Sequence, residues 1–442
     1  MGFEMNSSPI RLGDFFESEN INTTPKNTTS RNTTSKNTTS RNTTSRNTTS
    51  RNTTSRNTTS RNTTSRNTTS RNTTSRNITP KNTTPENITP ENITPENITP
   101  KKDCIFSTRY RGSKQKILDW IWDEIKDLDF HTFLDAMGGT GSVAYKAKKE
   151  GKKVTYNDKL KFNFFTGFAL IENDSVILNE SDVSFLLEKH DTLRYPTFVQ
   201  DTFNETYFTD EENAWIDMVI SNINLLGNKY KKAIAMHCLF QACIIKRPYN
   251  LFHRKNLYLR LNDVKRSFGN KVTWDKPFNE HFSKFVKEVN NCIFSNGEKC
   301  NALNYDVFDI PGSYDLVYID TPYLPEKGEI IDYRDAYHFL EGLAGYECWP
   351  GMVDAERKHK PLIREYCVWN DVKKINIAFD KLFDKFKDSI IVVSYRSDGI
   401  PSEEQLVQLL KKYKKNVREV KATDFKYVLS KKESKELLFI AY

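Results

Sequence analysis

Residues His131–Val143 (HTFLDAMGGTGSV) form a short apolar stretch that runs into glycines and then into the helix-like segment Ala144–Glu150. Glycines at a strand-to-helix turn let the backbone approach a ligand closely and direct free N–H groups at it. The next strand is expected at Lys153–Asn157, and Asp158 follows it directly. An acid at that distance from a glycine turn can accept hydrogen bonds from a ribose hydroxyl pair. The stretch therefore predicts an α/β fold with a ligand at the strand ends.

A second strand end carries a polar tetrad, Asp320–Tyr323 (DTPY). The preceding run, Tyr314–Ile319, reads as a buried strand because it is rich in β-branched and aromatic residues and follows a Pro-Gly-Ser turn. Open α/β sheets bind their ligands at the carboxyl ends of strands. There Asp320 and nearby backbone carbonyls can accept hydrogen bonds from a ring amine, while Tyr323 stacks on the ring. A strand-end Asp-x-Pro can equally form a cap and turn, so the tetrad alone leaves both interpretations open.

Together these segments resemble the S-adenosylmethionine-dependent amino-methyltransferases of DNA, specifically the alpha-group (Dam-like) adenine-N6 enzymes. The resemblance covers roughly residues 104–442. Tyr110–Lys114 (YRGSK) matches the family's amino-terminal cofactor motif, and Asp135–Gly141 (DAMGGTG) matches the next one. Ser394–Ser397 (SYRS) is similar to a later wall of the family's active site. The resemblance implies S-adenosylmethionine as the cofactor, bound by Tyr110, Gly112, Lys114, Asp135, Met137, Gly139, Gly141, Asp158 and Asp306.

Two positions depart from the family's motifs. Met137 stands where the family usually has Phe, and Thr321 replaces the first Pro of the family's Asp-Pro-Pro-Tyr. Pro322 still restrains the residue before it towards extended conformations, so we expect activity to survive. In the implied mechanism, acceptors in the tetrad hold the adenine amine so that its lone pair attacks the methyl group in line, and an aromatic ring stacks on the flipped base. The expected catalytic residues are Asp320, Thr321, Pro322 and Tyr323.

Composition and motif order divide the chain into segments. Residues 22–101 repeat a five-residue unit sixteen times, mostly Asn-Thr-Thr-Ser-Arg, which matches neither helix nor strand periodicity. Such a segment buries too little to offset its ordering entropy, so we expect a disordered tail. The rest predicts a Rossmann-like class I methyltransferase sheet with an inserted, partly helical target-recognition domain. The predicted segments are the tail (1–102), the cofactor-binding half (103–175), the insert (176–299) and the catalytic half (300–442).

Charge is informative only locally. The repeat segment holds 13 Lys/Arg against three Glu and residues 1–21 carry a net −3, so residues 102–442 carry about +2 of the whole chain's +9. Between Lys229 and Lys276, however, 12 Lys/Arg face only two acids, Asp263 and Asp275. A basic stretch interleaved with aromatic and amide side chains can neutralise phosphates and reach base edges, although most charge runs are solvated helix faces. The expected DNA-binding residues are Arg247, Arg254, Lys255, Arg260, Lys265, Arg266 and Lys271.

Three functions compete at this point. The leading one is a site-specific DNA adenine-N6 methyltransferase acting on double-stranded DNA, as the modification enzyme of a restriction-modification system with a possible partner endonuclease. A cytosine-N4 or RNA base amino-methyltransferase keeps the same cofactor fold. A surface or adhesion protein would use the Thr-rich repeats, but the chain start lacks the apolar core of an export signal. We expect a monomer in the cytoplasm, associated with the nucleoid, without a membrane span or a metal site.

Overall fold

A seven-stranded sheet forms the centre of the part of the chain that the structure describes. The computed structural model describes residues 106, 109–262, 271–325, 331–421 and 435–442, so the repeat segment 22–101 and its predicted disorder lie outside the described residues. The strand order is β3-β2-β1-β4-β5-β7-β6, with β1 to β5 parallel and β7 antiparallel to both of its neighbours. The predicted Rossmann-like α/β sheet is therefore confirmed. The strands are β1 (Thr132–Asp135), β2 (Lys153–Asn157), β3 (Asn301–Leu303), β4 (Leu316–Ile319), β5 (Ile390–Arg396), β6 (Val417–Lys421) and β7 (Glu436–Ala441).

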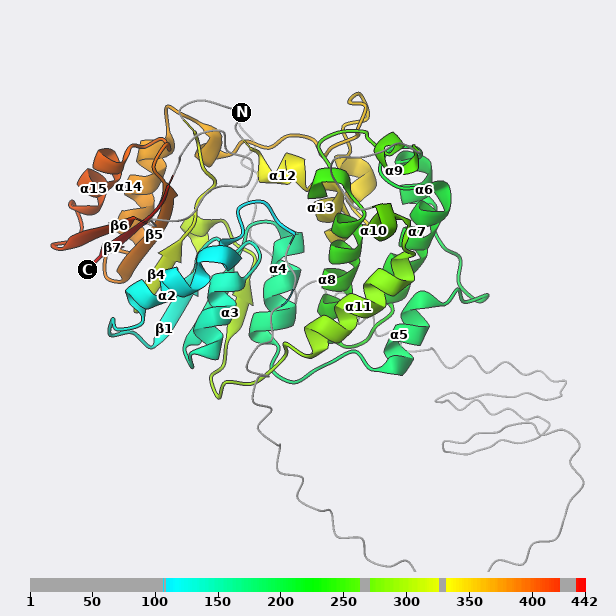
Figure 1. The fold of residues 1–442 in the computed structure, drawn as a ribbon, viewed down its shortest axis with the longest axis horizontal. Coiled ribbons are helices and arrows are strands. Elements are labelled where there is room, and N and C mark those ends of the chain that lie inside the picture. Colours follow the sequence, from blue (N-terminus) through cyan, green and yellow to red (C-terminus); the bar gives the residue numbers. More distant parts are fainter. Residues whose placement is uncertain (1–105, 107–108, 263–270, 326–330, 422–434) are drawn as a thin grey trace, which may run out of the picture. The chain divides into compact units, whose positions relative to one another are not determined.

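Both faces of the sheet are covered by helices. Successive strand residues point to opposite faces, so Phe133 and Tyr318 pack in one core while Leu134 and Val317 pack in another. The first core includes α2 (Leu118–Ile125), α3 (Ser142–Lys149) and α4 (Lys161–Gly167). The second includes α14 (Ile375–Lys385) and α15 (Glu403–Leu410). In Figure 1 these two sets of helices (cyan and orange) flank the strands.

A helical insertion separates β2 from β3 in the sequence. Figure 1 shows these helices, in green, gathered beyond α4, away from β5, β6 and β7. The helical character expected for the insert is present: a capping box at Thr209 begins one helix, and the Asn228 side chain caps the next. The inserted α-helices are α5 (Glu180–Leu187), α6 (Phe198–Thr202), α7 (Asp210–Asn224), α8 (Lys229–Ile245), α9 (Tyr258–Leu261), α10 (Lys271–Asp275) and α11 (Phe278–Asn290).

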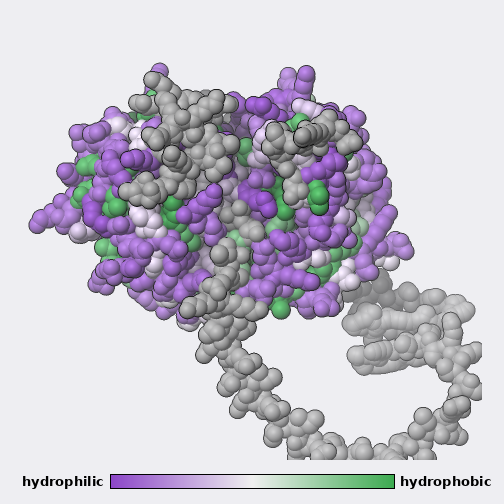
Figure 2. Space-filling model, in the orientation of Figure 1, coloured by the Kyte–Doolittle hydropathy of each residue, from purple (hydrophilic) through white to green (hydrophobic). Residues whose placement is uncertain are grey.

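A second, smaller insertion between β4 and β5 carries α12 (Tyr333–Ala336) and α13 (His338–Ala344). On the face shown in Figure 2, the described residues are mostly hydrophilic, with separate small hydrophobic patches. Within the described ranges, none of the helices combines the length and the apolar character that crossing a membrane requires. The short 3-10 and π elements are η1 (Lys114–Ile117), η2 (Phe168–Glu172), η3 (Pro248–Asn250), η4 (Val307–Asp309), η5 (Trp349–Met352) and η6 (Val368–Asn370).

Candidate active site

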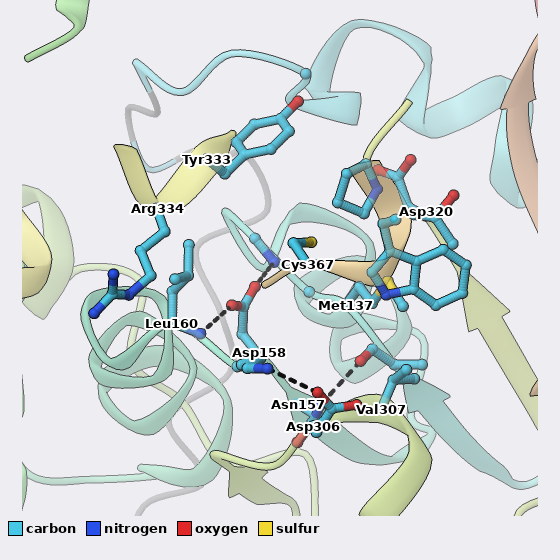
Figure 3. A pocket seen from close by; sticks show the side chains of 18 of the residues that line it. Met137, Asn157, Asp158, Leu160, Asp306, Val307, Asp320, Tyr333, Arg334 and Cys367 are labelled. Carbon is cyan, nitrogen blue, oxygen red and sulfur yellow. Dashed lines mark hydrogen bonds and ion pairs between the residues drawn. The ribbon is translucent and has the colours of Figure 1, made fainter. Parts of the chain in front are cut away.

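A cavity of about 850 Å³ lies at the carboxyl ends of the central strands. Parallel strands end at the same sheet edge, so the segments after β1, β2, β3 and β4 meet there. Figure 3 shows side chains from all four segments around one space, with Met137, Asp158, Asp306 and Asp320 among them. The two strand ends singled out in the sequence therefore share one site.

The glycine turn after β1 brings backbone to the cavity. Gly139 and Gly141 have positive φ values of 50° and 73°, which side-chain-bearing residues rarely adopt. Gly141 is the N-cap of α3 but does not itself line the cavity, in contrast to the cofactor contact that the resemblance implies. The buried Asp135 carboxylate accepts a hydrogen bond from Ala144 N (3.1 Å), so it anchors the first turn of α3. Burial raises the pKa of Asp135 to about 8, and the nearby charge of Asp320 adds to this rise.

Asp158, at the end of β2, connects the glycine turn to the cavity wall. Its Oδ2 accepts hydrogen bonds from Gly139 N (2.8 Å) and Asn163 Nδ2 (3.1 Å), and its Oδ1 accepts one from Leu160 N (2.8 Å). A carboxylate oxygen can accept two hydrogen bonds, so Oδ1 keeps capacity for a ligand hydroxyl. Burial raises the Asp158 pKa to about 7, although these backbone donors oppose the rise.

Asp306, after β3, lies at another part of the same cavity. Its Oδ2 accepts a hydrogen bond from Lys159 Nζ at 2.8 Å. Its Oδ1 accepts one from Phe308 N at 3.3 Å, so the Asp306 side chain caps the start of η4. Phe308 stacks on Trp369 with ring centroids 5.9 Å apart and also lines the cavity. An acid beside a partly exposed aromatic side chain suits a planar, amine-bearing ring.

Tyr110–Lys114 closes the cavity from the amino-terminal side. The Tyr110 ring stacks on Tyr337 and Tyr333, with centroids 4.7 and 5.5 Å away. Gly112 has a φ of 88°, and a Cβ there would come within 2.9 Å of the Tyr333 hydroxyl. The segment is thus fitted against α12, and glycine is required at position 112 by both backbone and space.

The tetrad after β4 binds a lysine that the resemblance implies as a cofactor contact. Lys114 Nζ lies 2.6 Å from Asp320 Oδ2 and 2.8 Å from the Tyr323 hydroxyl. Burial lowers the pKa of Lys114, but Asp320 and Glu436 together raise it above its ordinary value. Burial also raises the pKa of Asp320 to about 6, with Lys114 opposing and Glu436 adding to the rise. In this structure Lys114 therefore forms an ion pair with Asp320, the proposed catalytic acid.

Thr321 and Glu436 complete the polar surroundings of Asp320. Thr321 is buried, and its Oγ1 has no hydrogen-bond partner among the residues that the structure describes. Glu436 on β7 accepts a hydrogen bond from the Tyr323 hydroxyl at 3.0 Å. Glu436 was not predicted from the sequence as part of the site, because no local pattern shows that Glu436 and Lys114 meet. A charged residue at the start of a strand that is otherwise apolar was the available signal.

A comparison of the chain with models of protein families identifies its family. Residues 110–398, more than half of the chain, match the model of the D12 class N6 adenine-specific DNA methyltransferases. The chain belongs to this family. The matched region contains the glycine turn, Asp158, Asp306 and the tetrad, and the resemblance drawn from the sequence is confirmed.

Curated relatives of this methyltransferase include restriction-modification enzymes. The type II methyltransferase M2.HphI of Haemophilus parahaemolyticus is 29% identical over 343 residues, 75% of this chain and 96% of that protein. The type II methyltransferase M.FokI of Planomicrobium okeanokoites is 26% identical over 331 residues, 69% of this chain and 47% of that protein. The type II methyltransferase M.NlaIII of Neisseria lactamica is 24% identical over 321 residues, 69% of this chain and 88% of that protein. The chain thus spans nearly all of the first and about half of the second.

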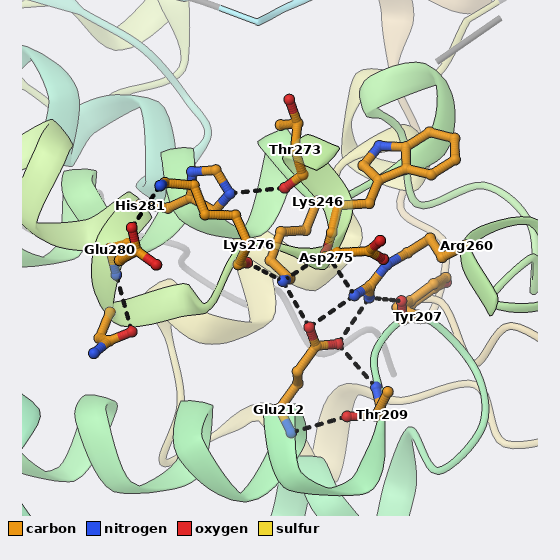
Figure 4. A network of polar contacts seen from close by, with 12 residues as sticks. Tyr207, Thr209, Glu212, Lys246, Arg260, Thr273, Asp275, Lys276, Glu280 and His281 are labelled. Carbon is orange, nitrogen blue, oxygen red and sulfur yellow. Dashed lines mark hydrogen bonds and ion pairs between the residues drawn. The ribbon is translucent and has the colours of Figure 1, made fainter. Parts of the chain in front are cut away.

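The predicted DNA-binding residues of the methyltransferase divide into buried and exposed groups. Arg247 is buried and donates to the carbonyls of Tyr207, Leu251 and Arg254. Arg260 is buried and donates to Glu212 at 2.7 Å (Figure 4). Burial argues against a DNA contact by Arg247 and Arg260, because protein acceptors use both guanidinium groups inside the helical insertion. Arg254 and Lys255 are exposed and Lys271 is partly exposed, whereas Lys265 and Arg266 lie outside the described residues.

Proposed function

We propose that this adenine-specific DNA methyltransferase transfers a methyl group from S-adenosylmethionine to N6 of a flipped adenine in duplex DNA. One observation carries the proposal: Asp320, Pro322 and Tyr323 line the same cavity as Asp158 and the glycine turn. The amine to be methylated and the methyl donor can therefore meet in one site. The family is adenine-specific, which favours adenine over the cytosine-N4 and RNA alternatives.

The cavity fits S-adenosylmethionine by the chemistry of its walls. Eight Asp or Glu side chains line it against six Lys or Arg side chains, and four of the acids (Asp135, Asp158, Asp306 and Asp320) lie at or shortly after the ends of strands. This excess of acids suits a ligand that carries a positive sulfonium. In this proposal Asp158 accepts from the ribose hydroxyls, Asp306 and Phe308 hold the adenine ring, and the turn around Met137 and Gly139 faces the methionine part. When bound, S-adenosylmethionine supplies an electrophilic methyl group. The residues of the chain bind it, orient it and exclude water.

Asp320 holds the target amine. The lone pair of adenine's exocyclic nitrogen is delocalised into the ring, so the nitrogen is a weak nucleophile. An Asp320 oxygen and the carbonyl of Thr321 or Pro322 accept hydrogen bonds from the two N–H groups of this amine. These bonds hold the amine in a geometry in which the lone pair is localised on the nitrogen. The negative charge of Asp320 stabilises positive charge that develops on nitrogen during transfer, and the proton leaves afterwards. A base stacked inside a duplex cannot reach this site, so it flips out and stacks on Tyr323.

In this proposal, cations on the surface of the helical insertion contact the DNA. Arg254 and Lys255 are exposed and Lys271 is partly exposed, and a cation that reaches the surface can neutralise a phosphate when DNA approaches. We assign residues 176–299 to target recognition on this basis. The type II relatives support a role as the modification enzyme of a restriction-modification system. We further propose that the protein acts as a monomer on nucleoid DNA in the cytoplasm, beside an endonuclease of the same specificity.

Asp158→Asn is expected to weaken S-adenosylmethionine binding roughly tenfold, because a charged hydrogen-bond acceptor contributes about 1.5–3 kcal/mol. The amide oxygen can still accept from Gly139, so the glycine turn is preserved. The Asp158 pKa is about 7, and the ionised form is the better acceptor for ribose. Wild-type affinity should therefore fall as the pH drops from 8 to 6, whereas the variant should lose this dependence.

Titration calorimetry across that pH range checks the prediction for Asp158. Asp174→Asn, an exposed acid outside the cavity, is the matched control and should bind the cofactor as the wild type does. Equal affinity of Asp158→Asn and wild type at pH 8 would remove Asp158 from the cofactor site.

Nucleoside analysis of the product tests the proposed reaction itself. Plasmid DNA from a host without adenine methylation is incubated with the protein and S-adenosylmethionine and then digested to nucleosides. We expect N6-methyladenine. Recovery of N4-methylcytosine, or of no methylated base with active, folded protein, would contradict the proposal.

A further inference from the structure

A buried carboxylate on the last strand lies against the proposed catalytic acid and its lysine. Glu436, the first residue of β7, is fully buried. Its Oε1 accepts hydrogen bonds from Ser394 Oγ (2.6 Å) and from the Tyr323 hydroxyl (3.0 Å), and it lies 3.7 Å from Lys114 Nζ. A carboxylate without water is costly unless it is paired and hydrogen-bonded, so these contacts hold it in place.

Lys114 lies between two acids. Its ammonium is 2.6 Å from Asp320 Oδ2 and 3.7 Å from Glu436 Oε1. Asp320 Oδ1 accepts a longer hydrogen bond from the Tyr323 hydroxyl (3.3 Å), so both oxygens of this carboxylate already have a donor. In the proposed reaction Asp320 must also accept from the adenine amine, and the Lys114 ammonium competes with that amine for the carboxylate. Glu436 is the second acceptor within reach of the same ammonium. Pairing of β5 with β7 places Glu436 opposite Arg396 and fixes its backbone. The longer and more flexible Lys114 side chain can therefore shift between Asp320 and Glu436 while these two carboxylates stay in place.

We propose that Glu436 is a positioning residue for methyl transfer. Glu436 pairs with the Lys114 ammonium when Asp320 accepts a hydrogen bond from the adenine amine. Glu436 also keeps its hydrogen bond from the Tyr323 hydroxyl. The inference rests on the proposed function, because it requires Asp320 to hold the target base. Glu436 touches neither substrate nor cofactor in this arrangement, and it neither gives nor receives a proton. Its effect is to leave an Asp320 oxygen available while the positive charge stays nearby.

The test replaces Glu436 by Gln, which keeps size and hydrogen bonding but removes the charge. Lys114 should then stay on Asp320, so kcat should fall roughly tenfold to 100-fold while KM for DNA and for S-adenosylmethionine changes less than about twofold. Glu419→Gln, on the neighbouring strand β6 and exposed, makes the same chemical change outside the cavity and should retain wild-type kcat.

A second readout separates positioning from packing. The charge of Glu436 contributes to the raised pKa of Asp320, so its removal should move the acid limb of the kcat–pH profile to lower pH. A loss of packing alone would lower kcat or stability without moving this limb. The charged or titratable groups that face Asp320 are Lys114, Tyr323, Glu436, Asp135, Tyr318 and Tyr333.

Wild-type kcat in Glu436→Gln, or a lowered kcat with an unmoved acid limb, would overturn the inference. If Glu436→Gln fails to fold, Ser394→Ala carries the test, because it removes one donor from Glu436 and keeps every charge. It should lower kcat at unchanged KM, and wild-type kcat would overturn the inference. Asp320→Ala, measured in parallel, keeps the two proposals distinct: if that variant is inactive while Glu436→Gln is fully active, only the inference on Glu436 fails.

Discussion

Replacing Asp320 by Ala should lower the rate of methyl transfer by about 100-fold to 1,000-fold, because the lost charge stabilises the transition state more than the bound substrate. The fold should persist, since Lys114 keeps Glu436 as an ionic partner. S-adenosylmethionine affinity should remain near the wild-type value, because Asp158 and Asp306 are unchanged. Single-turnover rates with labelled cofactor, together with cofactor titration, measure both quantities.

Asp388→Ala is the matched control for this experiment. Asp388 is an exposed acid just before β5 and does not line the cavity, so its removal should leave both rate and affinity unchanged. Near-wild-type turnover of Asp320→Ala would place the chemistry elsewhere in the molecule.

Arg260→Ala should destabilise the protein rather than specifically weaken DNA binding. Arg260 donates to both oxygens of Glu212, which also pairs with Lys246 at 2.8 Å (Figure 4). Removing one partner of a buried ion pair typically costs 3–5 kcal/mol, and partial exposure of Glu212 with a remaining lysine reduces this to roughly 2–3 kcal/mol. A loss of that size lowers the melting temperature by roughly 4–12 °C.

Arg254→Ala provides the comparison, since Arg254 is exposed on the same insertion. Its stability should stay within about 0.5 kcal/mol of wild type. Its DNA affinity should fall, and the slope of log affinity against log salt should flatten by about one phosphate contact. Wild-type stability in Arg260→Ala, combined with a flattened salt slope, would restore the DNA contact that burial argues against.

The sequence predicted those parts of the site that depend on local pattern. Strand ends followed by Gly139, Asp158 and Asp320 are visible locally, and parallel pairing brings such ends together at one edge. The interaction of Lys114 with Glu436 joins residues from the two ends of the catalytic unit, so no periodicity reveals it. The burial of Arg247 likewise depends on tertiary packing. A basic segment has the same sequence pattern whether its side chains contact phosphates or, as for Arg247, donate to backbone carbonyls.

Base-resolution methylation mapping of DNA from a host that expresses the chain tests the central claim most directly. The host must lack adenine methylation of its own, and cells expressing Asp320→Ala serve as the reference. We predict N6-methyladenine at one recurring short sequence in the wild-type DNA and its absence in the reference. Methylation of cytosine N4 instead, or adenine methylation that persists with Asp320→Ala, would contradict the account.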